Sequence, residues 1–207
     1  MKRLFIGLIV AATAAIGFGG VSAFADPSAN WQLASGSVKA ASDGSNTFNF
    51  SVPDKTWLLY NSKDPALLGN LTGTTMSATF RVADVSGNFT YGGEPSCGGT
   101  TGTVRLFFES IPPGTKFAFT NYWWADASTA SYVLANGTVT ISAIVDPALD
   151  QWSDWNGQPS ASNATDFNAA AANVTTVGLS FGGGCFFENG VGTTDGSGSF
   201  TLTNFTP

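Results

Sequence analysis

The sequence predicts an all-β protein: a single antiparallel β-sandwich with one short helical turn, following an N-terminal signal peptide. Apolar and polar residues alternate in short runs along the chain, and this period of two is typical of strands with one buried and one solvated face. Turn-forming dipeptides separate the runs, among them Asp43-Gly44 and Asn136-Gly137. Many short strands joined by polar turns favour two packed antiparallel sheets.

The alternating runs give the expected strands in order. Their apolar residues begin at Phe48, Ala78, Val104, Phe117, Val139, Val177 and Phe200. The expected helical turn is the Ala-rich segment 167–173, which Asp166 can cap and Asn173 can end in a left-handed conformation. A run of alanines favours helix but buries little apolar surface, so we expect this turn to be a connector.

The first 25 residues have the layout of a bacterial secretory signal peptide. Lys2 and Arg3 form a positive start, residues 4–16 form an apolar run, and Ala23-Phe24-Ala25 has the small-residue pattern of a cleavage site. The sequence therefore predicts a signal peptide at 1–25 and a β-sandwich domain at 26–207, in a protein that is secreted, periplasmic or held at the cell surface. The alternative interpretation is an uncleaved membrane anchor.

The charge of the chain excludes two classes of partner. The formal net charge of −6 becomes −8 once Lys2 and Arg3 leave with the signal peptide. Nucleic acids and anionic membrane surfaces require clustered positive charge, whereas the remaining Lys and Arg residues are scattered. After signal cleavage we expect no membrane span. The expected partner is a polysaccharide or glycan, or another surface protein.

Two stretches resemble a known family. In 56–82 an aromatic residue is followed by a Pro, a Leu-Gly-Asn turn and a strand; in 151–181 a Trp is followed by a Gly turn, an Asp-Phe helical turn and an Asn-Val-Thr strand. With the final Phe-Thr-Leu-Thr-Asn-Phe strand, they resemble the laminin-B-type branch of the galactose-binding-like jelly rolls. The resemblance implies a jelly roll of the kind that also hosts carbohydrate-binding modules. One fold carries many functions, so the ligand must be argued from residues.

The same resemblance suggests one metal. Some relatives bind a structural calcium near the first and last strands, and Asp43 and Asn46 offer the oxygen ligands that calcium prefers. Thr203 stands where relatives often carry an aspartate, so the alternative interpretation is that Asp43-Gly44 is simply a turn. No other cofactor is expected.

The chain contains no histidine, which excludes Ser–His–Asp and Cys–His catalytic arrangements and most zinc sites. A carboxylate pair of the glycosidase kind is the remaining enzymatic option. Its candidates are Glu94, Glu109 and Glu188. No catalytic motif accompanies them, so the sequence favours a protein that is not an enzyme, in which Glu94 and Glu188 are solvated loop acids and Glu109 lies at a strand end.

Two aromatic clusters favour sugar binding, because exposed rings stack on the C–H face of a pyranose and short polar groups bind its hydroxyls. The first cluster is 121–126. Alternation continued from the preceding run places Trp123 on the core face, and Tyr122 and Trp124 on the opposite face.

The second cluster is 151–158. Trp152 falls where the family pattern has its own Trp, which favours packing, whereas Trp155 lies beside Asp154 in a polar loop. The candidate ligand-binding residues are therefore Tyr122, Trp124, Asp154 and Trp155. The alternative is that these rings pack under a loop or at a sheet rim, because Trp is usually largely buried.

The two cysteines predict a disulfide. Cys97 and Cys185 both lie in Gly-rich segments beside an aromatic residue and a glutamate, and two cysteines in an exported protein are expected to pair. The glycines allow the two backbones to approach closely.

The leading hypothesis from the sequence is a secreted, non-catalytic carbohydrate-binding module. One alternative is a structural or adhesive surface protein that binds another protein, because a low-charge surface rich in Thr, Ser, Gly and Asn fits both. A carboxylate-based glycoside hydrolase is the third option.

Overall fold

The computed structural model describes residues 30–35, 38–39, 46–50, 55–92, 101–126, 130–183 and 187–207. The expected signal peptide lies outside these residues, as do Asp43, Glu94, Cys97 and Cys185. The signal peptide, the disulfide and the calcium ligand Asp43 therefore stay predictions.

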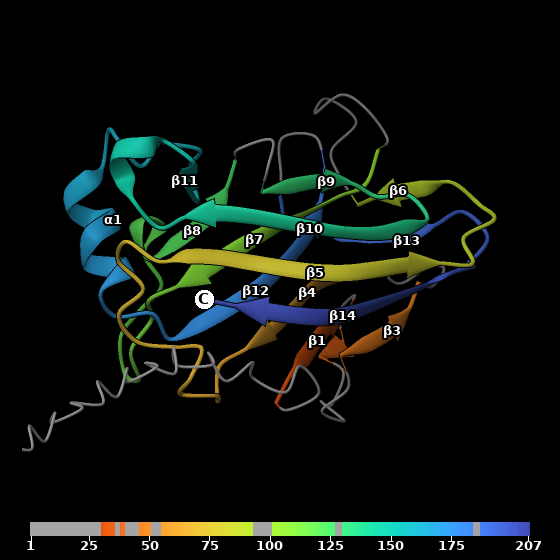
Figure 1. Cartoon of the computed structure of the whole chain (residues 1–207), viewed down its shortest axis with the longest axis horizontal. Coiled ribbons are helices and arrows are strands. Elements are labelled where there is room, and N and C mark those ends of the chain that lie inside the picture. Colours follow the sequence, from red (N-terminus) through yellow and green to blue (C-terminus); the bar gives the residue numbers. More distant parts are fainter. Residues whose placement is uncertain are drawn as a thin grey trace, which may run out of the picture.

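Within this part of the chain, the strands form two antiparallel sheets that pack face to face (Figure 1). Sheet A has the order β11-β8-β7-β12-β4-β1-β2; β9 lies beside β7, and β13 joins β4 to β6. Its strands are β1 Gln32–Ser35, β2 Val38–Lys39, β4 Thr56–Asn61, β6 Phe89–Tyr91, β7 Thr103–Glu109, β8 Tyr122–Ala125, β9 Ser131–Val133, β11 Trp152–Asp154, β12 Thr176–Gly182 and β13 Val191–Thr193.

Sheet B has the order β10-β5-β14-β3. Its strands are β3 Thr47–Asn49, β5 Thr75–Ala83, β10 Gly137–Ile144 and β14 Ser199–Thr206. The predicted fold class, an all-β sandwich, is confirmed. No helix among the described residues is long and apolar enough to cross a membrane.

The core between the sheets is filled by the inward residues of the alternating runs. Phe80 on β5 stacks on Phe200 of β14 with ring centroids 4.9 Å apart, and Phe181 of β12 meets Phe200 at 5.1 Å from the opposite sheet. All three side chains are fully buried. Burying each one stabilises the fold by about 1.5–3 kcal/mol, which explains why the alternation identifies the inward faces correctly.

The helical segment differs from the prediction in its limits. Helix α1 spans Ala164–Ala171 and follows Asn163, so Asp166 lies in its first turn and does not cap it. Asn173 is not in a left-handed conformation. An acidic side chain in the first turn still favours helix through the helix dipole, and this is why the helix can begin earlier than the capping pattern suggests.

The burial of α1 also corrects the prediction. Phe167 is fully buried, and its ring meets those of Trp123 and Phe108 at 4.9 and 5.6 Å. The alanines allow the helix backbone to approach the sandwich closely. The expected connector therefore closes one end of the core.

Strand β8 begins at Tyr122 and not at Phe117, where the alternation predicts a strand. Residues Phe119–Asn121 form a 3-10 turn, η2, and Phe117 and Phe119 are about half exposed. A second such turn, η3, spans Pro147–Leu149. The predicted facing of β8 nevertheless holds, because Trp123 is in the core cluster.

Candidate functional site

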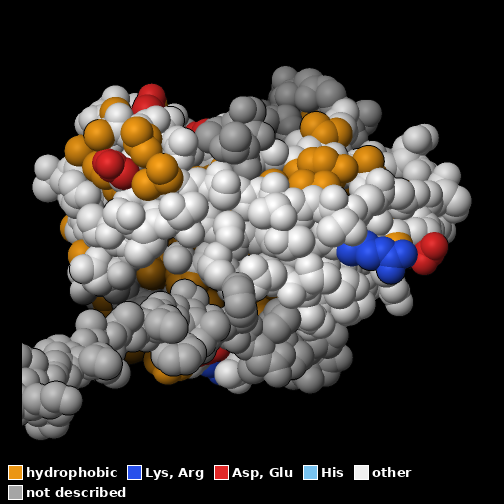
Figure 2. All heavy atoms as spheres, in the orientation of Figure 1, with side chains coloured by type: hydrophobic (Ala, Val, Ile, Leu, Met, Phe, Trp, Pro, Cys, Tyr) orange, Lys and Arg blue, Asp and Glu red, His pale blue; other side chains and the backbone are white. Residues whose placement is uncertain are grey.

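The outer face of sheet B is mainly uncharged and polar (Figure 2). Its hydroxyl groups pair across the strands: those of Thr79 and Thr140 lie 2.8 Å apart, and those of Ser77 and Thr206 lie 2.6 Å apart. These hydroxyls already bind one another, so the outer face of sheet B offers few groups for a ligand. We therefore look for a site on the outer face of sheet A.

The outer face of sheet A carries a group of aromatic side chains that is separate from the core between the sheets. Alternation along β7 and β8 turns Phe107, Tyr122 and Trp124 away from sheet B, and all three are buried there. This confirms the predicted facing of Tyr122 and Trp124. In the register, Trp124 lies opposite Phe107, Phe107 opposite Gly178, and Gly178 opposite Tyr60. Gly178 allows the close approach of its neighbours, since a Cβ there would lie 2.3 Å from the Leu59 carbonyl oxygen, 2.8 Å from Tyr60 Cα and 3.0 Å from the Phe107 ring.

Further rings extend this cluster to the surface. Trp155 stacks on Trp124 with ring centroids 4.9 Å apart and an interplanar angle of 27°. Phe117 meets Trp155 edge-on at 5.2 Å, and Phe119 meets Phe117 at 5.9 Å. Phe187 meets Trp124 at 5.3 Å. We call these connected rings the aromatic strip: Phe107, Phe117, Phe119, Tyr122, Trp124, Trp155 and Phe187.

Residues 187–190 fold back over the outer face of β12. The Ser180 hydroxyl donates a hydrogen bond to the Phe187 carbonyl at 2.5 Å, and the Gly190 N–H donates to the Phe181 carbonyl at 2.9 Å. These two bonds hold both ends of the segment to one strand, so Phe187 lies against Trp124 and Glu188 against Tyr122.

Arg105 also holds this segment. Its guanidinium carbon lies 3.6 Å from the centroid of the Phe187 ring, and it forms an ion pair with Asp126 at 3.2 Å. A guanidinium over an aromatic face is attractive because of the ring quadrupole. The Arg105 guanidinium is thus bound by the Phe187 ring and by Asp126.

Two carboxylates, Glu109 and Glu188, reach the same part of the face. Glu109 ends β7, and in the register it lies opposite Tyr122 on one side and Thr176 on the other. The Tyr122 hydroxyl donates to Oε2 of Glu188 at 2.5 Å. The structure therefore brings together two of the three glutamates that the sequence offered, and the third, Glu94, lies outside the described residues.

Burial raises the proton affinity of this cluster. It raises the pKa of Glu188 to about 7; the hydrogen bond from Tyr122 opposes the shift and the charge of Glu109 adds to it. Burial also raises the pKa of Glu109, against a hydrogen bond with Thr176. Burial and then the two glutamate charges raise the pKa of Tyr122 well above its usual value. Glu188 can therefore exchange its proton near neutral pH, as groups at functional sites often do.

The four predicted ligand residues lie close together but mostly below the surface. Tyr122 and Trp124 are 2% and 3% exposed, so neither presents a free ring face. Asp154 is also buried, and its Oδ1 accepts hydrogen bonds from two backbone N–H groups of the following loop, each at 2.9 Å. Asp154 thus shapes the loop that carries Trp155. Only Trp155 is partly exposed.

Sequence reasoning missed the exposed rings at the end of the strip. It assigned Phe117 and Phe119 to a strand that buries them. The signal for a turn was present in Pro112-Pro113-Gly114, a few residues earlier. Tyr60 was also missed, although its position next to the buried Leu59 on β4 turns it outward.

Four buried side-chain polar atoms of the described residues lack a hydrogen-bond partner of good geometry, and all four belong to this region. They are Arg105 Nε, Trp124 Nε1, Ser153 Oγ and Asn189 Nδ2. Trp124 and Ser153 have only looser polar interactions, with Tyr122 and Asp126 respectively. Ser153 lies opposite Trp124 in the register, and Asn189 follows Glu188 in the segment 187–190. Buried polar groups are normally paired, so this concentration distinguishes the outer face of sheet A from the rest of the described chain.

The calcium candidate Asn46 has a structural use. Its side-chain amide donates to the Leu202 carbonyl at 2.6 Å, while Thr203, at the position that relatives often fill with an aspartate, donates its hydroxyl to the Thr79 carbonyl at 3.0 Å. Both residues tie strands of sheet B together. The described residues contain no group of three or more acidic or cysteine side chains that could hold a metal ion.

No protein-family model, curated protein or solved structure matches the chain. The resemblance to galactose-binding-like jelly rolls therefore stays a prediction, and a function has to be argued from the geometry.

Proposed function

We propose that the protein is a secreted, non-catalytic module that binds a carbohydrate chain at the exposed end of the aromatic strip. The observation that carries the proposal is that the strip reaches the surface: Phe117 and Phe119 are 47% and 50% exposed, and Phe117 contacts the half-buried Trp155. A pyranose presents C–H groups that pack against exposed aromatic faces. Three neighbouring rings offer more than one such position, which suits a chain better than a single sugar.

The buried part of the strip holds the exposed part in place. Trp124 lies under Trp155, and the Tyr122 ring meets Trp155 at 5.2 Å. A ring that is fixed before binding loses less conformational entropy when the ligand arrives. In this proposal Trp155 contacts the ligand, Tyr122 and Trp124 support it, and Asp154 shapes its loop.

Hydrogen-bonding groups lie beside the buried part of the strip, around Tyr122. Tyr60, Glu109 and Glu188 are each partly exposed on the same face. Hydroxyl and carboxylate groups of this kind fix the orientation of a sugar through its hydroxyls, while the rings supply contact area.

Retention on insoluble polysaccharides, followed by a glycan array, tests the proposal. We expect the mature protein to bind at least one glycan and the Phe117→Ala/Phe119→Ala/Trp155→Ala variant to lose that binding, because each lost ring contact costs about 0.5–1.5 kcal/mol. The matched control is Val133→Ala/Ile144→Ala, which removes exposed apolar side chains outside the strip and should bind normally.

Two outcomes would refute the proposal: retention on no glycan, or unchanged binding by the triple variant. An exposed aromatic surface also fits a protein partner. A cross-linked or light-scattering complex in the absence of glycan binding would favour the structural or adhesive alternative.

A glycoside hydrolase is the second candidate, and one observation favours it: Glu109 and Glu188 both lie at Tyr122, and the charge of Glu109 raises the pKa of Glu188. In such a reaction Glu188 donates its proton to the glycosidic oxygen as that C–O bond breaks. Glu109 takes a proton from the water that forms the new C–O bond. A pKa near the working pH suits a residue that donates a proton.

Release of reducing sugar from a broad panel of glycosides tests the second candidate. If the protein is a hydrolase, Glu188→Gln and Glu109→Gln each abolish turnover, whereas glycan retention falls only slightly, because the Gln amide still hydrogen-bonds to sugar hydroxyls. No turnover by the wild-type protein on any glycan that it binds would exclude the hydrolase and leave the binding module.

A further inference from the structure

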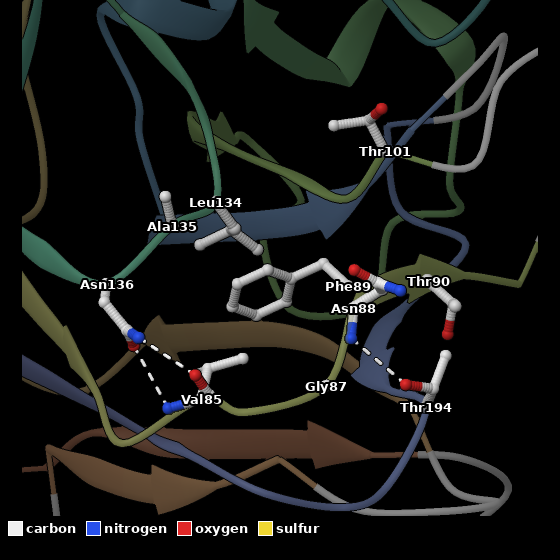
Figure 3. A pocket seen from close by; sticks show the side chains of 10 residues that line it. All are labelled: Val85, Gly87, Asn88, Phe89, Thr90, Thr101, Leu134, Ala135, Asn136 and Thr194. Atoms are coloured by element: carbon white, nitrogen blue, oxygen red, sulfur yellow. Dashed lines mark hydrogen bonds between the residues drawn. The ribbon is translucent and has the colours of Figure 1, made fainter.

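A separate pocket (Figure 3) is built from connections between strands that lie, in Figure 1, at the end of the sandwich away from α1. Its volume is about 570 Å³, within the range of about 300–1,000 Å³ that is usual for small-molecule sites. Residues from the connections β5–β6, β9–β10 and β13–β14 line it. Each of these connections passes from one sheet to the other, and loops that a rigid scaffold positions are where binding sites are commonly built.

Hydrogen bonds between the loops fix the rim of this pocket (Figure 3). The Asn136 side chain accepts from the Val85 N–H at 3.1 Å and donates to the Val85 carbonyl at 2.9 Å. The Asn88 N–H donates to the Thr194 hydroxyl at 3.0 Å, and the Thr194 N–H donates back to the Asn88 carbonyl at 2.9 Å. All three connections are therefore tied into one frame.

A second set of bonds lies behind the rim. Backbone N–H groups of Ser86 and Gly87 both donate to the Ser197 hydroxyl oxygen, at 2.9 and 3.2 Å, and the Ser86 hydroxyl donates to Asp195 at 2.8 Å. Hydrogen bonds from Ser197 and then Ser86 lower the pKa of Asp195 to about 2, so the bracing persists at every physiological pH. A pocket that is already formed avoids the entropy cost of ordering its loops on binding.

The lining combines an apolar floor with an uncharged polar rim. The side chains of Phe89 and Leu134 lie beside each other at the centre of Figure 3, and both pack on the main core. None of the ten lining residues carries a charge. The Asn88 amide and the Thr101 hydroxyl form no hydrogen bond with any described residue. Within the described part of the chain, the rim therefore has donors and acceptors that no other residue uses.

We propose that this pocket binds a small neutral ligand with one apolar face and several hydroxyls, such as a single sugar ring or another cyclic polyol. The apolar face packs on Phe89 and Leu134, and the hydroxyls bind the side chains of Asn88 and Thr101. A charged ligand is disfavoured, because none of the lining side chains carries an opposite charge, and the Lys55 ammonium beside the pocket is already bound to the Thr90 hydroxyl at 2.8 Å. This site does not depend on the aromatic strip, which lies on an outer face and offers stacking positions for a chain.

Ligand-observed NMR and calorimetry on the mature protein test this inference. The probes are neutral monosaccharides and inositols, with glucuronate and glucosamine as charged counterparts of similar shape. Ala135→Trp fills the pocket from an exposed lining position, and Asn88→Asp adds a negative charge at nearly constant shape. Asn168→Ala on the exposed surface of α1 is the matched control.

We expect at least one neutral probe to bind, Ala135→Trp to abolish that binding and Asn88→Asp to weaken it by about tenfold or more. Asn168→Ala and the triple variant of the strip should bind that probe as the wild type does. The inference fails if no neutral probe binds, if both pocket variants bind normally or if the charged probes bind more tightly. If the triple variant of the strip loses binding of the neutral probe, the probe binds at the aromatic strip, and the inference about the pocket is wrong. Circular dichroism melts identify any variant that does not fold, and either pocket variant alone suffices for the test.

Discussion

The two faces of sheet A are both rich in aromatic residues, but they differ in how their polar atoms are satisfied. On the inner face, the indole N–H groups of Trp123 and Trp152 donate to backbone carbonyls at 2.9 and 2.8 Å. On the outer face, the indole N–H of Trp124 makes no hydrogen bond of good geometry with a described residue, and its only polar interaction is a looser one with the Tyr122 hydroxyl. The neighbouring Tyr122 hydroxyl binds Glu188, a carboxylate whose pKa is raised to about 7.

This difference shows that aromatic density alone does not identify a site. A ring that only stabilises the fold has its polar atoms bound internally, because an unpaired buried donor costs free energy without return. A face that keeps unpaired donors and carboxylates with raised pKa values sacrifices some stability. We therefore expect substitutions on the inner face to change mainly the free energy of unfolding, and those on the outer face to change mainly binding and pH response.

The largest expected effect is on the inner face. Phe108→Ala should lower the free energy of unfolding by about 3–5 kcal/mol, because the fully buried ring leaves a cavity among its contacts with Trp152 and Phe167. Urea unfolding followed by Trp fluorescence measures the change. The matched control is Phe119→Ala, a half-exposed ring that should cost far less. Equal losses for the two variants would contradict the distinction.

The predicted Cys97–Cys185 disulfide should help to hold residues 187–190 over the outer face of sheet A, because Cys185 lies just before this segment in the sequence. Described residues that flank the two cysteine segments are in contact: the Gly92 N–H donates to the Gly190 carbonyl at 2.9 Å. Reduction, or the double Cys→Ser variant, should lower the free energy of unfolding by about 2–4 kcal/mol. Mass spectrometry of the unreduced mature protein is the direct check, and two free thiols would refute the pairing.

The pH response should reside on the outer face. Because the pKa of Glu188 is about 7 in the folded protein against 4.5 for a free glutamate, protonation favours the folded state. The free energy of unfolding should therefore be highest below pH 4.5 and fall by about 2–3 kcal/mol as pH rises through 7. Thermal melts between pH 4 and 8 measure this slope, and Glu188→Gln should flatten it. A wild-type stability that rises over this interval would contradict the assignment.

The smallest expected effect on stability belongs to Trp155. Trp155→Ala should cost about 1.5 kcal/mol of unfolding free energy, because this half-buried ring loses its contacts with Trp124, Tyr122 and Phe117, each worth about 0.5 kcal/mol at a partly exposed position. Its effect on glycan retention should be larger than its effect on stability. If Trp155→Ala unfolds the protein as readily as Phe108→Ala while leaving retention unchanged, the outer face is a second core and not a ligand site.

The parts of the fold that could be predicted are those encoded locally. Alternation over a few residues marks which side of a strand is buried, and it correctly places Trp123 inward and Tyr122 and Trp124 outward. It fails at Phe117 and Phe119, where a turn interrupts the strand but the apolar pattern continues by coincidence. It also underestimates α1, because one Phe167 buries more surface than the adjacent alanines suggest.

The candidate site could be predicted only in pieces. The sequence identifies Trp155, Glu109 and Glu188 as separate candidates, and it relates Glu188 to Glu94 through the expected disulfide. Glu188 contacts Tyr122 only because residues 187–190 fold back over β12. That fold depends on hydrogen bonds between residues several positions apart, and the place of Tyr122 depends on the register of four strands. No local pattern carries that information.

Periodicity along the chain is enough to specify the sandwich and the facing of most of its strands, because a period of two decides which side chains meet water. Which outward side chains share one surface follows instead from strand order and register, so it is a property of the folded molecule. The tertiary structure also sets the protonation of Glu109 and Glu188, because a carboxylate acquires a raised pKa only when other parts of the chain bury it. The same holds for the pocket at the far end, whose rim requires three connections to meet.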